Sequence, residues 1–187
     1  MRLSNYSLRG MVSIVVLVFV AALTPVAVYS FSKLSPAYAG TAAATATNPS
    51  CVTPKVVIWL DTEGSGVAGS IYYDLEFTNL SGHTCTILGY PGVSAVGLNG
   101  HQLGSAASDN ASHKPFAVTI PNGSTAAAVL QIVDVSHFST STCHPQTAAG
   151  LRVLLPHETG SKIVPFPFPA CSSTKPSYLK VQAVQKT

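Results

Sequence analysis

A short alternating segment in the first half of the chain constrains the fold more than any other feature. Between residues 71 and 78, apolar or aromatic side chains recur at every second position, with mostly polar ones between them. The first set is Ile71, Tyr73, Leu75 and Phe77, and the second is Tyr72, Asp74, Glu76 and Thr78. Because successive side chains of a strand point to opposite faces, this period of two predicts a β-strand with one face in the core and the other in water.

The same segment leads into a second apolar run. Residues 79–83, NLSGH, have the composition of a tight turn, and an apolar run follows from Cys85 to Leu88. We therefore expect these two runs to pair as neighbouring strands. Pro91-Gly92 then suits the two central positions of a further turn.

Several more short strands are expected along the chain. In the first of them, 52–60, Val56, Ile58 and Leu60 alternate with Val57 and Trp59, and Trp59 could lie under a sheet or on the surface. The others are 93–98, 101–103, 116–120, 125–135, 151–155, 163–168 and 178–184. Many short strands at regular spacing, without a convincing helix, predict an all-β chain, a single antiparallel β-sandwich of immunoglobulin-like two-sheet architecture.

Glycine and proline set further limits. The glycine spacing of residues 64–69, GSGVAG, matches a dinucleotide-binding loop, but that motif needs a following helix, and here a β-branched and aromatic strand follows. We interpret it as a hairpin loop. Segment 104–114 is expected to be a mobile loop and 136–150 a long connection. Three alternate prolines at 165, 167 and 169 cannot donate to a β-ladder, so they belong at a sheet edge or in an extended crossover.

The first 50 residues differ from the rest. Basic Arg2 and Arg9 flank a polar start, residues 11–28 are almost wholly apolar, and Ala37-Tyr38-Ala39 is a small-residue cleavage pattern. This order predicts a signal peptide over 1–39, then a flexible Ala/Thr-rich lead-in over 40–50 and a β-sandwich domain over 51–187. The alternative is an uncleaved N-terminal helix that anchors the protein in the membrane.

Charge argues against one class of partner. Three of the ten basic side chains lie in residues 1–39, whereas all seven acidic ones lie beyond. A cleaved chain would be formally neutral, so the basic footprint that nucleic-acid binding needs is missing.

The four cysteines, Cys51, Cys85, Cys143 and Cys171, predict two disulfides in an exported domain. Three pairings are possible. We favour Cys51 with Cys85 and Cys143 with Cys171, because each pair ties a loosely held segment to a strand end. A zinc site is disfavoured, since no Cys-x-x-Cys spacing occurs.

No cofactor or metal is expected. The six histidines, His83, His101, His113, His137, His144 and His157, fall in turns, loops or strand ends. His137 and His144 share one segment, which prompts the hypothesis of a copper carrier. However, Met1 and Met11 are the only methionines, so the predicted domain lacks the thioether ligands that select Cu(I).

Catalytic patterns are also missing from the sequence. Neither a Gly-x-Ser-x-Gly elbow nor a His-Glu-x-x-His motif occurs, and the acidic residues are scattered. Asp74 and Glu76 share a strand face, as paired glycosidase carboxylates could, but acids on a wet face are far more often solubilising. We do not expect an enzyme and assign no catalytic residues.

The chain resembles a known family. The features that match are the strand ending in Phe77-Thr78-Asn79, the following Ser81-Gly82, and the run CTILGYPGV from Cys85 to Val93. Cys51, Trp59, Gly100, Pro121-Asn122-Gly123 and Cys143 fit the same pattern. Together they resemble the domain of unknown function 4232 family of secreted actinobacterial proteins, over roughly 51–184. The resemblance implies an extracytoplasmic location and a fold, and it carries over no catalytic residue.

We therefore expect an uncharacterised secreted or cell-envelope protein that acts as a non-catalytic binding or structural module. Its partner would be an envelope protein, a glycan or another polymer, with no nucleic acid, and with the membrane only if the N-terminal segment stays uncleaved. The alternative is an extracytoplasmic carrier of a small ligand or of copper, and a hydrolase ranks third. A concave pocket with convergent polar groups would favour the carrier.

Overall fold

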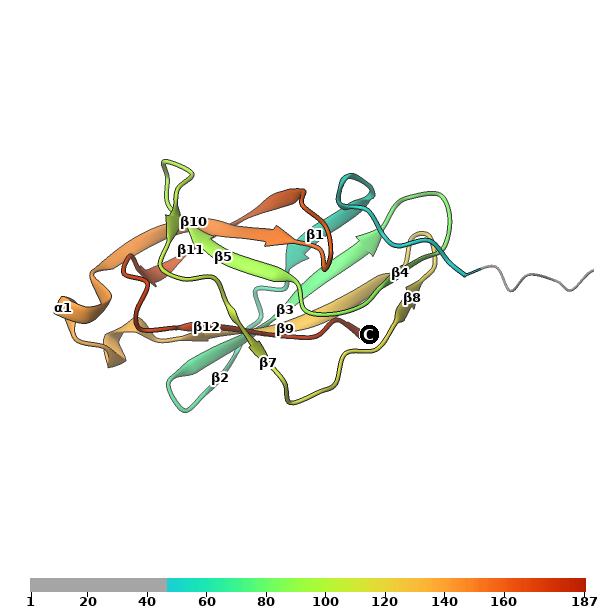
Figure 1. Ribbon diagram of the computed structural model, residues 1–187. Coiled ribbons are helices and arrows are strands. Elements are labelled where there is room, and N and C mark those ends of the chain that lie inside the picture. Colours follow the sequence, from blue (N-terminus) through green and yellow to red (C-terminus); the bar gives the residue numbers. More distant parts are fainter. Residues whose placement is uncertain (1–46) are drawn as a thin grey trace, which may run out of the picture. The chain divides into compact units, whose positions relative to one another are not determined.

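The alternating segment is the second strand of the larger sheet. In the computed structural model, which describes residues 47–187, it forms β3 (Ser70–Asn79). β3 pairs antiparallel with β1 (Val56–Leu60) on one side and with β9 (Thr125–Val133) on the other (Figure 1). Both edges of β3 are thus occupied by long-range partners.

The larger sheet has the order β1-β3-β9-β12-β7, with β2 and β13 attached to β3 and β9. Its remaining strands are β12 (Leu179–Gln182), β7 (Ser108–Asn110), β2 (Ser65–Val67) and β13 (Gln185–Lys186). β7 lies in the segment expected to be a mobile loop, and it pairs parallel with β12. The loop prediction for 104–114 is therefore wrong in part, and the sheet is not purely antiparallel.

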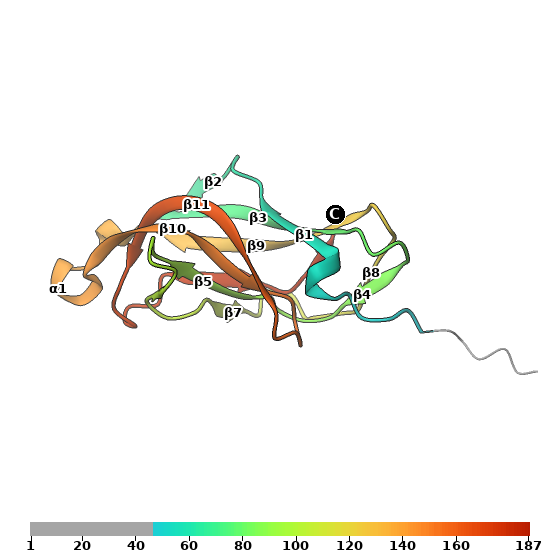
Figure 2. The ribbon, with the colours of Figure 1, turned by 90° about the horizontal axis from the view of Figure 1, so that it is seen from above.

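A second sheet faces the first. It contains β11 (Ser161–Cys171), β10 (Pro145–Leu154), β5 (Gly92–Val96) and β6 (Gln102–Leu103), in that order. Figure 1 shows β10 and β5 in a layer above β9 and β12, and in Figure 2, seen from above, β10 and β11 lie across the strands of the larger sheet. β11 is an edge strand, which confirms the position expected from its three prolines. The domain is an all-β sandwich, as predicted.

The run after β3 does not pair with it, which corrects the expected neighbouring pair. β4 (Cys85–Ile87) instead pairs with β8 (Val118–Ile120) in a separate two-stranded sheet. The side chain of Asn79 explains this placement, since its Nδ2 donates to the carbonyl oxygens of His83 and Ile120, each at 2.8 Å. These bonds hold the turn and β8 together at the end of β3.

Three short helices interrupt the strands: η1 (Thr53–Lys55), η2 (Val135–His137) and α1 (Thr140–Cys143). Pro54 lies in the first turn of η1, where a missing N–H costs nothing, so the first strand begins at 56 rather than 52. The expected connection 136–150 is shorter than predicted, because β10 already begins at Pro145.

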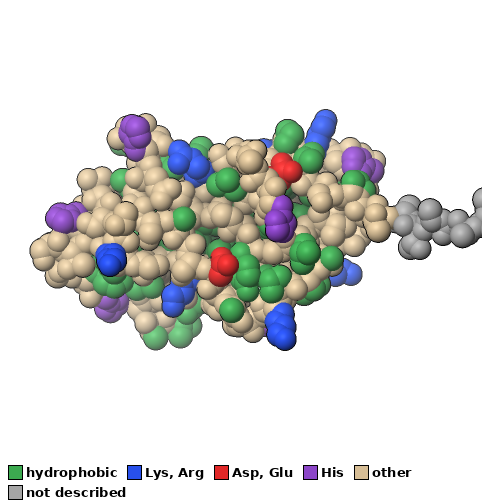
Figure 3. Space-filling model, viewed as in Figure 1, with side chains coloured by type: hydrophobic (Ala, Val, Ile, Leu, Met, Phe, Trp, Pro, Cys, Tyr) green, Lys and Arg blue, Asp and Glu red, His purple; other side chains and the backbone are tan. Residues whose placement is uncertain are grey.

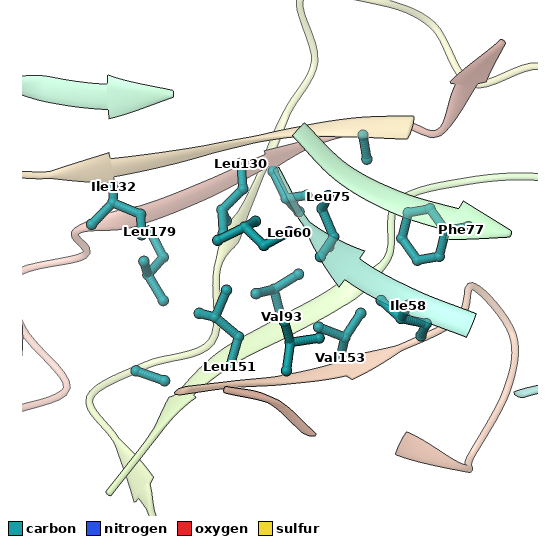
Figure 4. Close-up of a cluster of buried hydrophobic side chains, with 14 of the residues drawn as sticks. Ile58, Leu60, Leu75, Phe77, Val93, Leu130, Ile132, Leu151, Val153 and Leu179 are labelled. Carbon is teal, nitrogen blue, oxygen red and sulfur yellow. The ribbon is translucent and has the colours of Figure 1, made fainter. Parts of the chain in front are cut away.

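The core lies between the two sheets. Alternate residues of β1, β3 and β9 point towards β5 and β10, as Figure 4 shows for Leu75 and Leu130, with Val93 of β5 and Val153 of β10 facing them. Leu75, Phe77 and Leu130 are fully buried, and each such side chain contributes about 1.5–3 kcal/mol by leaving water.

Two disulfides staple the domain. Cys51 bonds to Cys85 and Cys143 bonds to Cys171, the pairing favoured from the sequence among three possibilities. They indicate an oxidising compartment outside the cytoplasm. Among residues 47–187, no helix has the length and apolar character needed to cross a membrane. The predicted signal peptide, 1–39, and most of the lead-in lie outside the described residues.

Candidate functional site

A groove opens where the inner face of β3 loses its cover. Leu75 and Phe77 are fully buried, whereas Tyr73 is half-buried and Ile71 is 41% exposed. The sequence correctly predicted that Ile71, Tyr73, Leu75 and Phe77 share the inner face of the strand. It was wrong in placing Ile71 in the core. β1 pairs with the half of β3 from Leu75 to Asn79, whereas only the short, exposed β2 pairs with the other half, at Ser70 to Tyr72. In that half, Ile71 and Tyr73 line a hollow together with residues of β11.

This hollow, which we call the aromatic groove, has a volume of about 410 Å³. β3, β9, η2 and β11 supply its walls. Its lining residues are Ile71, Tyr73, Ile132, Val133, Asp134, Val135, Phe166, Pro167, Phe168 and Pro169. Nine of these ten are apolar or aromatic, so the groove offers packing surface and few groups that could orient a polar ligand.

Three rings form the centre of the groove. Phe166 meets Tyr73 edge to face, with ring centroids 5.0 Å apart, and lies 5.6 Å from Phe168. Edge-to-face geometry suits the opposite charges of ring edge and ring face, so these contacts hold the rings in fixed positions. The groove is therefore a preformed surface.

The single acid of the groove is committed to structure. The Asp134 carboxylate accepts a hydrogen bond of 2.9 Å from the backbone N–H of Ser136, and this bond lowers the pKa of Asp134. A carboxylate held ionised in this way is a poor proton donor near neutral pH. Asp134 caps η2 and does not prepare the groove for acid–base catalysis.

A second surface of interest lies on the outer face of the larger sheet. Trp59 is 43% exposed there, and its Nε1 donates to Thr78 Oγ1 at 3.4 Å. Trp59 pairs in register with Glu76, and the ladder continues through an Asp61 N–H bond of 2.9 Å to the Asp74 carbonyl oxygen. We call Trp59, Asp61, Asp74 and Glu76 the Trp59 face.

The three acids of the Trp59 face affect one another. The pKa of Glu76 is raised, first by desolvation of its carboxyl group and then by the negative charges of Asp61 and Asp74. The ionised form of Glu76 is thus less favourable here than it would be for a glutamate in water. This surface holds negative charge that its own residues do not neutralise.

None of the six histidines lines the aromatic groove or belongs to the Trp59 face. All are exposed, and residues 47–187 contain no group of three or more His, Cys, Asp or Glu side chains that could hold a metal. His137 lies against Gly69, while His144 bonds through Nδ1 to Ser173 Oγ at 2.7 Å. The structure therefore does not bring His137 and His144 together as metal ligands.

The His144–Ser173 pair was not anticipated from the sequence. A serine bonded to histidine is the start of a nucleophilic site, which also needs an orienting acid and an oxyanion hole. Here the pair spans the Cys143–Cys171 disulfide, next to a backbone bond of 3.2 Å from Ser173 N to the Cys143 carbonyl oxygen. We interpret it as part of that structural staple.

A family model describes most of the domain. The model named Domain of unknown function (DUF4232) matches residues 51–185. The chain belongs to this family. The DUF4232 match covers both disulfides, the aromatic groove and the Trp59 face, and it names no activity. Neither the curated proteins nor the solved structures contain a match to the chain.

Proposed function

We propose that this DUF4232 domain is a non-catalytic binding module that takes an extended apolar segment of a partner protein into the aromatic groove. The observation that carries the proposal is the ring cluster at the groove, in which the partly exposed Tyr73 and Phe166 pack beside the buried Phe168. The volume of about 410 Å³ lies in the range of ~300–1,000 Å³ that is common for ligand sites.

The proline pattern of β11 favours recognition by side chains. Pro165, Pro167 and Pro169 lack N–H groups, so this edge strand cannot form a regular ladder with an added strand. A partner segment would have to pack on rings and proline faces. Polyproline II segments are recognised in this way in aromatic-lined grooves.

A small-ligand carrier is the second candidate, and the volume of the groove favours it. The apolar lining would suit an acyl chain or another apolar molecule and offers little to a polar one. Copper carriage and hydrolysis gain no support from the described residues. The binding test below therefore includes a fatty acid as well as a peptide.

Binding to the groove is expected to depend on Phe166. A fluorescein-labelled peptide of alternating proline and leucine should bind the purified domain, and fluorescence anisotropy should show affinity at least about tenfold lower for Phe166→Ala, since a central ring is lost. Ile163→Ala is the matched control. Ile163 lies on the same strand, is 53% exposed and points to the opposite face.

Two results would refute this proposal. One is equal loss of affinity in the two variants, and the other is no peptide binding by the unsubstituted domain. If cis-parinaric acid binds and the peptide does not, the carrier replaces the binding module.

The location of the module is a further part of the proposal. We propose that residues 1–39 act as a signal peptide and that the protein is secreted, or held at the cell envelope if they remain. The support is the order of basic, apolar and small residues together with two disulfides. Expression in a secreting host should release a chain beginning at Gly40, as N-terminal sequencing would reveal. A chain beginning at Met1 in the membrane fraction would contradict cleavage.

A further inference from the structure

The acids of this domain are concentrated on one region. Four of the seven acidic side chains, at positions 61, 63, 74 and 76, belong to the loop after β1 or to β3. The remaining three are separate: one is in β7, one caps η2, and Glu158 accepts from the Thr53 hydroxyl. On the side drawn in Figure 3, acidic side chains are few and basic ones are scattered. The negative charge near β1 and β3 is therefore a local feature.

The arrangement of these acids opposes stability. Asp61 and Asp74 are cross-strand neighbours, joined by the backbone bond of 2.9 Å, and Glu76 follows Asp74 on the same face. Like charges directly opposite each other on adjacent strands are destabilising. Such a local conflict is typical of a functional surface, because folding alone would not favour it.

An exposed indole lies within the same group. Trp59, on β1, is opposite Glu76 in register and two residues before Asp61, which follows the strand. On the far side of β3, the neighbours of Glu76 and Asp74 are the small Ala127 and the apolar Val129, which carry no charge. The indole and the carboxylates therefore lie side by side on an uncovered sheet face.

We propose that the Trp59 face binds a positively charged side chain, the ammonium or guanidinium group of a basic segment of a partner protein. Three carboxylates attract the charge, and the face of the Trp59 ring supplies a cation–π contact. Arginine adds stacking and paired hydrogen bonds to a carboxylate. A metal ion fits less well, because within residues 47–187 no three such ligands converge.

One basic side chain lies beside the Trp59 face. Lys186 of β13 lines a hollow of about 210 Å³ together with Asp74, Ala127 and Val129. A basic side chain thus already lies at the Asp74 end of the face. The cation of the partner is therefore placed over Trp59, Glu76 and Asp61, at the β1 edge of the face.

The test uses the only tryptophan of the chain as its reporter. Hexa-arginine amide, added to the purified domain at low salt, should change Trp59 emission with saturation, and the affinity should fall as salt rises. Glu76→Gln should weaken binding about threefold to tenfold. Asp109→Asn removes the same charge from β7, away from this face, and should leave the affinity unchanged.

Each other outcome counts against the proposal. No saturable change in emission would refute it, and equal effects of Glu76→Gln and Asp109→Asn would reduce it to unspecific attraction. Binding of a neutral β-glucan oligosaccharide without binding of hexa-arginine would assign the face to a glycan. Phe166→Ala should leave hexa-arginine binding intact, which separates this surface from the aromatic groove.

Discussion

Phe77→Asp is expected to prevent folding of the domain. Phe77 has no exposed surface and lies in the core between the two sheets. An aspartate there would lose the burial of a phenyl ring and leave a carboxylate without a partner, at a cost of several kcal/mol for desolvation alone. That loss is comparable with the whole stability of a typical domain, about 5–15 kcal/mol.

Two variants of the same strand serve as controls. Tyr72→Asp places the same charge on the outer face and should change the free energy of unfolding by less than about 1 kcal/mol. Ile71→Asp lies on the inner face with Phe77, but at the open groove, so the variant should still fold. Urea unfolding followed by Trp59 fluorescence measures all three. Loss of folding in Ile71→Asp would mean that the groove is closed in solution.

Much of the fold could be predicted from local pattern. The alternation from Ile71 to Thr78 assigned each side chain to the correct face, because a strand fixes that alternation without reference to its partners. The prolines of β11 predicted an edge for the same kind of reason, since a missing N–H is a property of the residue itself.

The pairing of strands could not be predicted in the same way. β4 follows β3 in the chain but pairs with β8, because β1 and β9 already occupy both edges of β3. Asn79 illustrates the difficulty. It reads as a turn residue, yet it is fully buried and donates to carbonyl groups of His83 and Ile120, the second of them 41 positions away. Such contacts depend on tertiary structure.

The candidate surfaces also combine features that local sequence predicts with features that depend on tertiary structure. A search by residue type led to histidines and cysteines, which the structure uses as exposed side chains and as disulfides. The alternation of Phe166 and Phe168 with prolines was a usable signal for one wall of the groove. The Trp59 face, in contrast, depends on the register of β1 with β3, which no local pattern gives.

Removal of either disulfide is expected to lower the free energy of unfolding by about 3.5 kcal/mol in the chain-entropy model. The two bonds close loops of similar size, with sequence separations of 34 and 28. The variants Cys51→Ser/Cys85→Ser and Cys143→Ser/Cys171→Ser should therefore unfold at similarly reduced urea concentrations. Removal of both bonds should lower the free energy of unfolding by about 7 kcal/mol. Because this loss is comparable with the total stability of a typical domain, the variant without either bond should be unfolded.

The two bonds should differ in their effect on the groove. Cys171 is the last residue of β11, close to the groove residues Phe168 and Pro169, and Cys143 ends α1. The Cys51–Cys85 bond ties the start of the domain to β4, at the other end in Figure 1. At equal loss of stability, the Cys143→Ser/Cys171→Ser variant should bind the proline–leucine peptide more weakly, and the Cys51→Ser/Cys85→Ser variant should bind it normally. Equal peptide affinities would show that β11 keeps its position without the staple, because the ladder between β10 and β11 would then be sufficient.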